Sequence, residues 1–124
     1  METKSILLVD DEFSIVEALA EVLQCEGYSV RTAPNGERAL EELARAPPAL
    51  ILLDFMMPVM DGLQALAKIR ADPGLQKIPV VLMTAAALPD GASGWDAVLR
   101  KPFEASALVK LLRRLLTPPS TSAT

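Results

Sequence analysis

Short runs of apolar and β-branched residues alternate with amphipathic stretches along the whole chain. Most of these runs are bounded by charged residues, proline or glycine, which is typical of strands buried on both faces of a sheet. The runs predict strands at 5–9, 28–33, 50–53, 79–84 and 97–99. Apolar residues at helical spacing predict helices around 15–23, 37–45, 63–71 and 105–115. Strands that alternate with helices predict a parallel α/β sheet with right-handed crossovers.

Residues 85–95, between the last two predicted strands, break this alternation. Three successive alanines favour a helix, but Pro89 cannot donate a backbone hydrogen bond, and Gly91 and Gly94 raise the cost of ordering the chain. An average helix needs ~10–14 residues. The sequence therefore predicts a loop in this stretch, with at most a turn or two of helix.

Acidic residues end the first and third predicted strands. Asp10, Asp11 and Glu12 follow the first strand, and Asp54 follows the third. In a doubly wound sheet of order 2-1-3-4-5 these strands are neighbours, and ligands bind in the crevice between their carboxyl ends. Clustered carboxylates need a cation to stay ionised together, and oxygen ligands suit Mg²⁺. The alternative is that the residues at 10–12 only cap the next helix and that Asp54 only ends a strand.

Two further polar residues stand at predicted strand ends. Thr84 ends the fourth strand, where its hydroxyl could donate to a phosphoryl oxygen. Lys101 follows the fifth strand, where its ammonium could pair with a carboxylate or a phosphate. The bond between Lys101 and Pro102 is a candidate cis peptide. Each residue is common at such a place, but strand ends carrying Asp-Asp, Asp, Thr and Lys in this order form a much more specific pattern.

The composition is that of one globular domain. The 124 residues are 51% hydrophobic and 23% charged, and the formal net charge of −4 disfavours nonspecific nucleic-acid binding. No apolar run approaches the length of a membrane span. The single cysteine, Cys25, is predicted to be a packed apolar residue and is compatible with a reducing cytoplasm. We expect a cytoplasmic domain over 1–117, with 118–124 as a tail or the start of a linker.

The strand-end residues belong to longer motifs, at 8–12, 53–54, 57–58, 60–62, 84–85 and 101–103. Together these motifs resemble the receiver domain of bacterial two-component response regulators, and the likeness covers residues 4–116. The resemblance implies a flavodoxin-like, five-stranded parallel sheet of order 2-1-3-4-5, here with a shortened or missing fourth helix. It also implies a phosphoryl acceptor rather than a turnover enzyme.

The resemblance further implies a role for each residue of the site. Asp54 would accept a phosphoryl group from a phosphohistidine of a sensor histidine kinase or histidine phosphotransfer protein. Thr84 and Lys101 would hold the phosphoryl oxygens. Mg²⁺ would be held by Asp11, Asp54 and the backbone carbonyl of Met56, with Asp10 acting through water. The chain has no histidine, so it can receive from a phosphohistidine but cannot carry one.

Two departures from the family leave a rival interpretation open. Val98 stands where receivers usually have an aromatic residue that moves with the threonine, and the 85–95 segment is short. The rival is a pseudo-receiver, a protein-interaction module that signals without phosphate. If the chain is phosphorylated, we expect the signal to order the 85–95 loop through Thr84, with Trp95 either filling part of the gap or packed as an ordinary core residue.

Two other protein classes share parts of this pattern. A phosphatase of the haloacid dehalogenase type needs an acid two residues after the nucleophile, where Met56 stands. A flavodoxin-like electron carrier needs a hydroxyl-rich phosphate loop after the first strand, whereas this loop is acidic. The sequence predicts no direct contact of this domain with nucleic acid or membrane. It leaves open the cognate kinase, the output and whether the chain forms a homodimer.

Overall fold

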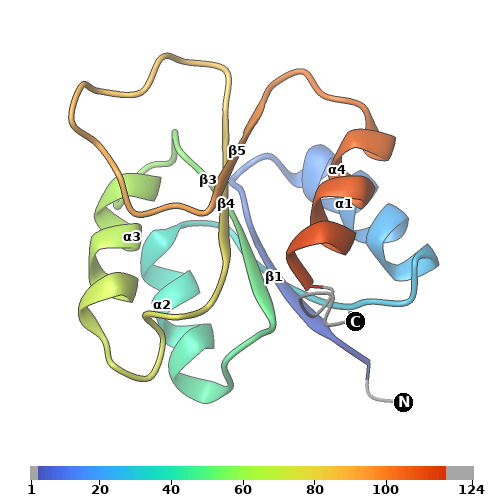
Figure 1. Ribbon diagram of the computed structural model, residues 1–124, viewed down its shortest axis with the longest axis horizontal. Helices are drawn as coiled ribbons and strands as arrows, with labels where there is room; N and C mark the ends of the chain where they lie inside the picture. Colours follow the sequence, from blue (N-terminus) through green and yellow to red (C-terminus); the bar gives the residue numbers. More distant parts are fainter. Residues whose placement is uncertain (1–2, 117–124) are drawn as a thin grey trace, which may run out of the picture.

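The computed structural model describes residues 3–116, which fold into a five-stranded parallel sheet between two helical layers (Figure 1). The strands are β1 (Ser5–Val9), β2 (Ser29–Ala33), β3 (Leu50–Asp54), β4 (Val80–Thr84) and β5 (Ala97–Arg100). The helices are α1 (Phe13–Cys25), α2 (Gly36–Arg45), α3 (Gly62–Ala71) and α4 (Ala105–Leu116). The sheet order is β2-β1-β3-β4-β5, with every pairing parallel. The predicted fold class is therefore confirmed.

The two helical layers enclose two separate apolar cores. Helices α1 and α4 cover one face of the sheet, and α2 and α3 cover the other (Figure 1). Every residue of β3 and β4 is buried, and successive side chains enter opposite cores. The core beneath α2 and α3 takes Leu7, Ile51, Leu53 and Leu82. The core beneath α1 and α4 takes Ile6, Leu8, Leu52 and Met83. Two buried faces explain why these strands read as continuous apolar runs rather than alternating ones.

The loop between β3 and α3 folds tightly over the end of β3. The amide of Gly62 donates to the carbonyl oxygen of Phe55 at 2.8 Å. A Cβ atom at Gly62 would lie 2.5 Å from the carbonyl oxygen of Asp54, so only glycine fits here without displacing the end of β3. Asp61 and Gln64 then form a capping box that begins α3. Gly62, Asp61 and Gln64 thus determine the path of the chain from Asp54 to the start of α3.

No helix forms between β4 and β5 in the part of the chain that the structure describes, which agrees with the predicted loop. Arg70 of α3 holds the distal end of this segment. Its Nε donates to the carbonyl oxygen of Gly94 at 2.7 Å, and one Nη donates to Oδ2 of Asp96 at 2.8 Å. The same Asp96 oxygen accepts the amide of Val80 at 2.8 Å. Trp95 is partly buried against the core beneath α2 and α3. Arg70 and Trp95 thus hold the distal end of this segment against the domain, although the segment contains no helix.

Several smaller predictions have mixed outcomes. Cys25 is exposed, so its predicted packing is wrong. It lies two residues after the buried Leu23, about 200° further around the helix, and therefore points away from the core. Among residues 3–116, no helix has both the length and the apolar character needed to cross a membrane. The predicted tail or linker at 118–124, and with it the domain boundary at 117, lies outside the described residues.

Candidate functional site

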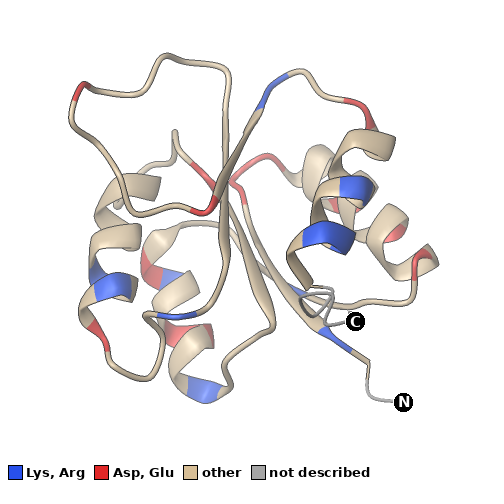
Figure 2. Ribbon diagram, in the orientation of Figure 1, with Lys and Arg blue, Asp and Glu red and all other residues tan. Residues whose placement is uncertain are grey.

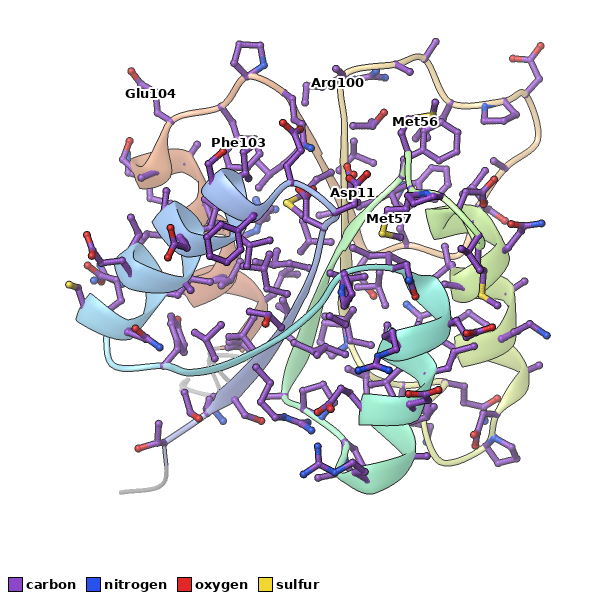
Figure 3. The ribbon with its side chains drawn as sticks, turned by 180° about the vertical axis from the view of Figure 1, so that it is seen from behind. Asp11, Met56, Met57, Arg100, Phe103 and Glu104 are labelled. Atoms are coloured by element: carbon purple, nitrogen blue, oxygen red, sulfur yellow. The ribbon has the colours of Figure 1, made fainter. Side chains whose placement is uncertain are left out.

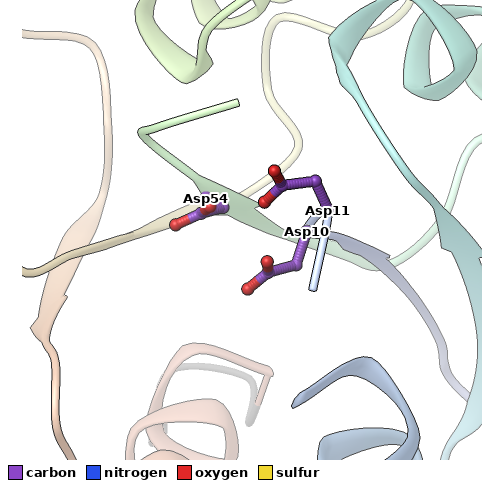
Figure 4. Close-up of side chains that lie close together, drawn as sticks. All are labelled: Asp10, Asp11 and Asp54. Atoms are coloured by element: carbon purple, nitrogen blue, oxygen red, sulfur yellow. The ribbon is translucent and has the colours of Figure 1, made fainter. Parts of the chain in front are cut away.

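Three carboxylates meet at the carboxyl ends of β1 and β3. Val9 and Leu53 are paired in register, so Asp10 and Asp54 follow on adjacent strands. One oxygen from each of Asp10, Asp11 and Asp54 lies within 4.8 Å of the others (Figure 4). Asp10 is 2% exposed and Asp54 is 4% exposed, while Asp11 is open to solvent. This arrangement concentrates negative charge at one point and leaves one of the three carboxylates facing the solvent.

Lys101 brings a positive charge into the same cluster from the end of β5. Its Nζ lies 3.0 Å from Oδ1 of Asp54 and 3.3 Å from Oδ2 of Asp10. The backbone amide of Lys101 donates to the carbonyl oxygen of Thr84 at 2.9 Å, which continues the pairing of β4 and β5 past the last strand residue. The Lys101–Pro102 peptide is cis, as the sequence suggested. Figure 2 shows the acidic strand ends and the basic segment that follows β5 at the same edge of the sheet.

The surroundings shift the protonation of both charged partners. Burial raises the pKa of Asp54 to about 6, the neighbouring charges of Asp10 and Asp11 add to the rise, and Lys101 opposes it. Burial alone lowers the pKa of Lys101, but its hydrogen bonds and ion pairs with Asp54 and Asp10 outweigh that effect, so the net shift is upward. At neutral pH the carboxyl group of Asp54 is therefore mainly ionised, and the single ammonium group of Lys101 offsets only part of the negative charge of the cluster.

Helix capping accounts for only a small part of this cluster. Glu12 occupies the N-cap position of α1, but its side chain makes no capping hydrogen bond. The amide of Glu12 instead donates to Oδ1 of Asp10 at 3.0 Å, which orients that carboxylate. Neither observation gives Asp11 or Asp54 a role in the helix. A divalent cation is the partner that this set of oxygen atoms fits.

Thr84 is buried at the end of β4 and its hydroxyl is engaged by the following loop. Its Oγ1 donates to the carbonyl oxygen of Ala86 at 3.0 Å and accepts the Ala86 amide at 2.9 Å. The threonine therefore belongs to the same edge of the sheet as the carboxylates, while its hydroxyl is satisfied locally. A hydroxyl has one proton, so that of Thr84 can donate to another acceptor only when its hydrogen bond to the Ala86 carbonyl oxygen breaks.

An open cleft of about 520 Å³ gives access to the cluster. Its lining comprises Asp11, Glu12, Asp54, Met56, Ala85, Ala86 and Lys101. The side chain of Met56 is exposed beside it, at the same edge as Asp11 (Figure 3). The structure thus brings together the carboxylates, the lysine and Met56 around one opening, with small alanine side chains forming the wall after β4.

Sequence reasoning missed one polar side chain near this cleft. Nη1 of Arg100, the last residue of β5, donates to the carbonyl oxygen of Ala86 at 3.1 Å. Its position directly before Lys101 at a strand end was the available signal. The contact itself depends on how the 85–96 segment folds back, which the residue pattern does not reveal.

Comparison with known sequences places most of the chain in one family. The family model described as "Response regulator receiver domain" matches residues 6–113. Response regulator Rre1 of Synechocystis is 38% identical over 98% of this chain and 55% of its own length. The DNA-binding response regulator MtrA of Mycolicibacterium paratuberculosis is 36% identical over 90% of this chain and 50% of its own length. The chain thus spans about half the length of the curated relatives it matches.

Solved structures show the same likeness in three dimensions. The chemotaxis protein CheY4 of Vibrio cholerae is 32% identical, with a TM-score of 0.86 over 93% of this chain and 100% of that one. The receiver domain of the sensor histidine kinase PA1611 from Pseudomonas aeruginosa is 29% identical, with a TM-score of 0.86 over 94% of this chain and 100% of that one. The latter structure contains a magnesium ion coordinated in its active site cleft.

Proposed function

The chain belongs to the response regulator receiver family of two-component signalling, and on that premise we propose that it accepts a phosphoryl group on Asp54. The donor is a phosphohistidine of a sensor histidine kinase or of a histidine phosphotransfer protein. The observation that carries the proposal is the buried Asp54 carboxylate at a strand end, 3.0 Å from Lys101 Nζ and beside two further aspartates. In this proposal the chain is itself the acceptor that becomes phosphorylated, rather than a turnover enzyme.

The donor set also supports a magnesium site. Clustered carboxylates with one solvent-facing member, only partly offset by a lysine, match the oxygen ligands that Mg²⁺ prefers. The groups that would hold the ion are the carboxylates of Asp10, Asp11 and Asp54 and the backbone carbonyl of Met56. When bound, the ion supplies positive charge against the phosphoryl oxygens.

Asp54 acts as the nucleophile in this proposal. One carboxylate oxygen forms the new O–P bond while the P–N bond of the phosphohistidine breaks and its electron pair leaves with the imidazole. Because the pKa of Asp54 is about 6, the carboxylate is mainly ionised at neutral pH and ready to attack. Lys101, already beside Asp54, offsets charge on a transferred oxygen. The hydroxyl of Thr84 turns from Ala86 to another phosphoryl oxygen, so occupancy of Asp54 is felt by the loop after β4.

Intact-mass measurement with acetyl phosphate and Mg²⁺ tests the acceptor directly. We expect one added phosphoryl group on the unaltered protein and none on Asp54→Asn. The matched control is Asp90→Asn, which changes an exposed carboxylate outside the cluster and should leave uptake unchanged. Uptake by Asp54→Asn at the level of the unaltered protein would show that another residue is the acceptor.

A phosphorylation-independent interaction module remains the second candidate. It is favoured by the missing helix between β4 and β5 and by Val98, which replaces the usual mobile aromatic side chain. The same measurement separates the two candidates. A folded protein that gains no mass with acetyl phosphate, and none with a phosphorylated histidine phosphotransfer protein, would support the interaction module.

A further inference from the structure

The carbonyl group of Ala86 joins two polar side chains from neighbouring strand ends. It accepts a hydrogen bond from Thr84 Oγ1 at 3.0 Å and another from Arg100 Nη1 at 3.1 Å. A carbonyl oxygen has two lone pairs, so both donors can bind it at once. The amide of the same residue donates back to Thr84 Oγ1 at 2.9 Å. The threonine hydroxyl and the arginine guanidinium are therefore connected through a single peptide unit.

Arg100 lies on the face of β5 that the 85–96 segment covers. Val98 stands two residues earlier, so both side chains leave the same face of the sheet. Val98 packs against the core beneath α2 and α3, which places this face on the side of the loop. Arg100 follows at the upper end of the strand, near the cleft edge that also carries Asp11 and Met56 (Figure 3). Val98 has no polar atom with which to sense the loop, whereas Arg100 already binds it.

Two hydrogen bonds connect the end of β5 to the end of β4 and to the loop that follows it. The backbone amide of Lys101 binds the carbonyl oxygen of Thr84 at 2.9 Å, and the side chain of Arg100 binds the carbonyl oxygen of Ala86. The first contact connects strand to strand and resists displacement. The second connects β5 to the loop, and its donor is a long exposed side chain that can follow a moving acceptor.

Release of the threonine hydroxyl would change this network in a defined way. The Ala86 carbonyl would lose its neutral donor but keep Arg100, whose charged donor makes the stronger kind of hydrogen bond. The Ala86 amide would lose its acceptor and need a new one. Arg100 therefore lowers the free-energy cost of releasing the Thr84 hydroxyl, because it keeps the Ala86 carbonyl oxygen hydrogen-bonded. Its side chain stays bound to this peptide group as the group moves.

We propose that Arg100 is the positioning residue that couples Thr84 to the 86–95 loop. It would take over the role that an aromatic side chain at the position of Val98 has in related receivers. This inference rests on the proposed phosphorylation of Asp54. When the Thr84 hydroxyl turns toward the phosphoryl group, Arg100 holds the Ala86 carbonyl in its new position and so orders the loop that follows. The signal thus passes through a guanidinium–carbonyl contact rather than through rotation of residue 98.

The test uses the full 124-residue chain with Mg²⁺ and beryllofluoride as the phosphoryl mimic. Fluorine NMR measures occupancy of Asp54, the Ala86 amide resonance reports release of Thr84, and hydrogen exchange reports ordering of 87–95. Arg100→Met removes the donor and keeps the aliphatic stem, and Arg100→Lys restores a charged donor. Arg114→Met, which removes an exposed positive charge from α4, is the control.

In the unaltered protein we expect occupancy to shift the Ala86 resonance and slow exchange in the loop. Arg100→Met should reach the same occupancy and retain the Ala86 shift, but lose about fivefold of the added protection, the equivalent of one hydrogen bond. Arg100→Lys should recover most of it, and Arg114→Met should match the unaltered protein.

Two results would overturn the role of Arg100 alone. One is a loop response in Arg100→Met equal to that of the unaltered protein at equal occupancy. The other is an equal loss in Arg114→Met, which would indicate a general effect of charge. If the unaltered protein shows no occupancy at all, the proposed function itself fails, and the coupling fails with it.

Discussion

At the scale of single residues, the site depends on an acid that burial has made less acidic. The carboxyl group of Asp54 titrates near 3.8 in an ordinary environment and near 6 in the folded chain. Between these pH values the folded state holds a proton that the unfolded state has released. The free energy of unfolding therefore falls as the pH rises through this window, because ionising the buried carboxyl costs stability.

Asp54→Asn should remove this pH dependence, since the amide does not titrate. In metal-free buffer we expect the variant and the unaltered protein to unfold alike at about pH 3 and below, where the carboxyl is mainly neutral in both states. At pH 7 the variant should be more stable, by at most about 3 kcal/mol. Urea unfolding at a series of pH values measures the difference. A variant that is less stable at pH 7 would show that the ion pair with Lys101 outweighs the burial of charge.

Lys101 is the second residue whose chemistry can be separated from the fold. Its ammonium contacts Asp54 and Asp10 at a strand end, so Lys101→Ala removes little of either apolar core. We expect phosphoryl uptake from acetyl phosphate to slow by about 10²-fold, the usual scale for removing one preorganised electrostatic contact. Lys110→Ala, an exposed site on α4, is the matched control. Loss of the native circular dichroism spectrum in Lys101→Ala would instead indicate a structural role.

At the scale of elements, α3 anchors the 85–96 segment, which connects β4 to β5 without a helix of its own. Arg70, near the end of α3, binds the carbonyl groups of Gly94, Gln76 and Ile78 as well as Asp96. The sequence predicted the loop because proline and two glycines are unfavourable in a helix. It did not predict Arg70 as its anchor, since Gly94 and Asp96 lie 24 and 26 positions further along the chain and only the tertiary fold brings them together.

Replacing Arg70 by methionine should therefore destabilise the whole domain and free the distal part of the 85–96 segment. The variant leaves three carbonyl groups and the Asp96 carboxylate without this donor, so we expect a loss of about 2–4 kcal/mol in the free energy of unfolding. Arg38→Met removes an exposed arginine of α2 that makes an i,i+3 ion pair, and should cost less than about 0.5 kcal/mol. Urea unfolding measures both. Equal effects in the two variants would show that the Arg70 contacts add little.

At the scale of the whole molecule, the alternation of strands and helices was enough to predict a parallel sheet with right-handed crossovers, and the resemblance to receiver domains supplied its strand order. The parallel direction of the strands brings Asp10, Asp54 and Lys101 to one edge of the sheet, and the order makes the strands that carry Asp10 and Asp54 neighbours. The finer features were not predictable, because they depend on side-chain direction within the folded chain. Among them are the Thr84 hydroxyl bound to Ala86 and the Arg100 contact with the same carbonyl.

Binding of Mg²⁺ to the carboxylate cluster should stabilise the entire fold, because the unfolded chain does not hold the three aspartates together. A concentration of Mg²⁺ tenfold above its dissociation constant corresponds to about 1.4 kcal/mol. We expect the melting temperature to rise with Mg²⁺ in the unaltered protein and in Asp90→Asn. It should respond much less in Asp11→Asn, which lacks the exposed ligand. The same increase in Asp11→Asn would place the ion elsewhere.

The anchors at the two ends of the 85–96 segment also bear on how such a domain can diversify. Arg100 and Thr84 bind its beginning at Ala86, and Arg70 binds its end at Gly94. The residues between these anchors form no helix or strand, and doubling the length of such a loop costs only about 0.6 kcal/mol. Insertions between Leu88, which packs against the core beneath α2 and α3, and Gly94 would leave both cores and the acidic edge in place. This stretch can accordingly take new sequence, such as a peptide tag or a recognition motif, at a low cost in stability.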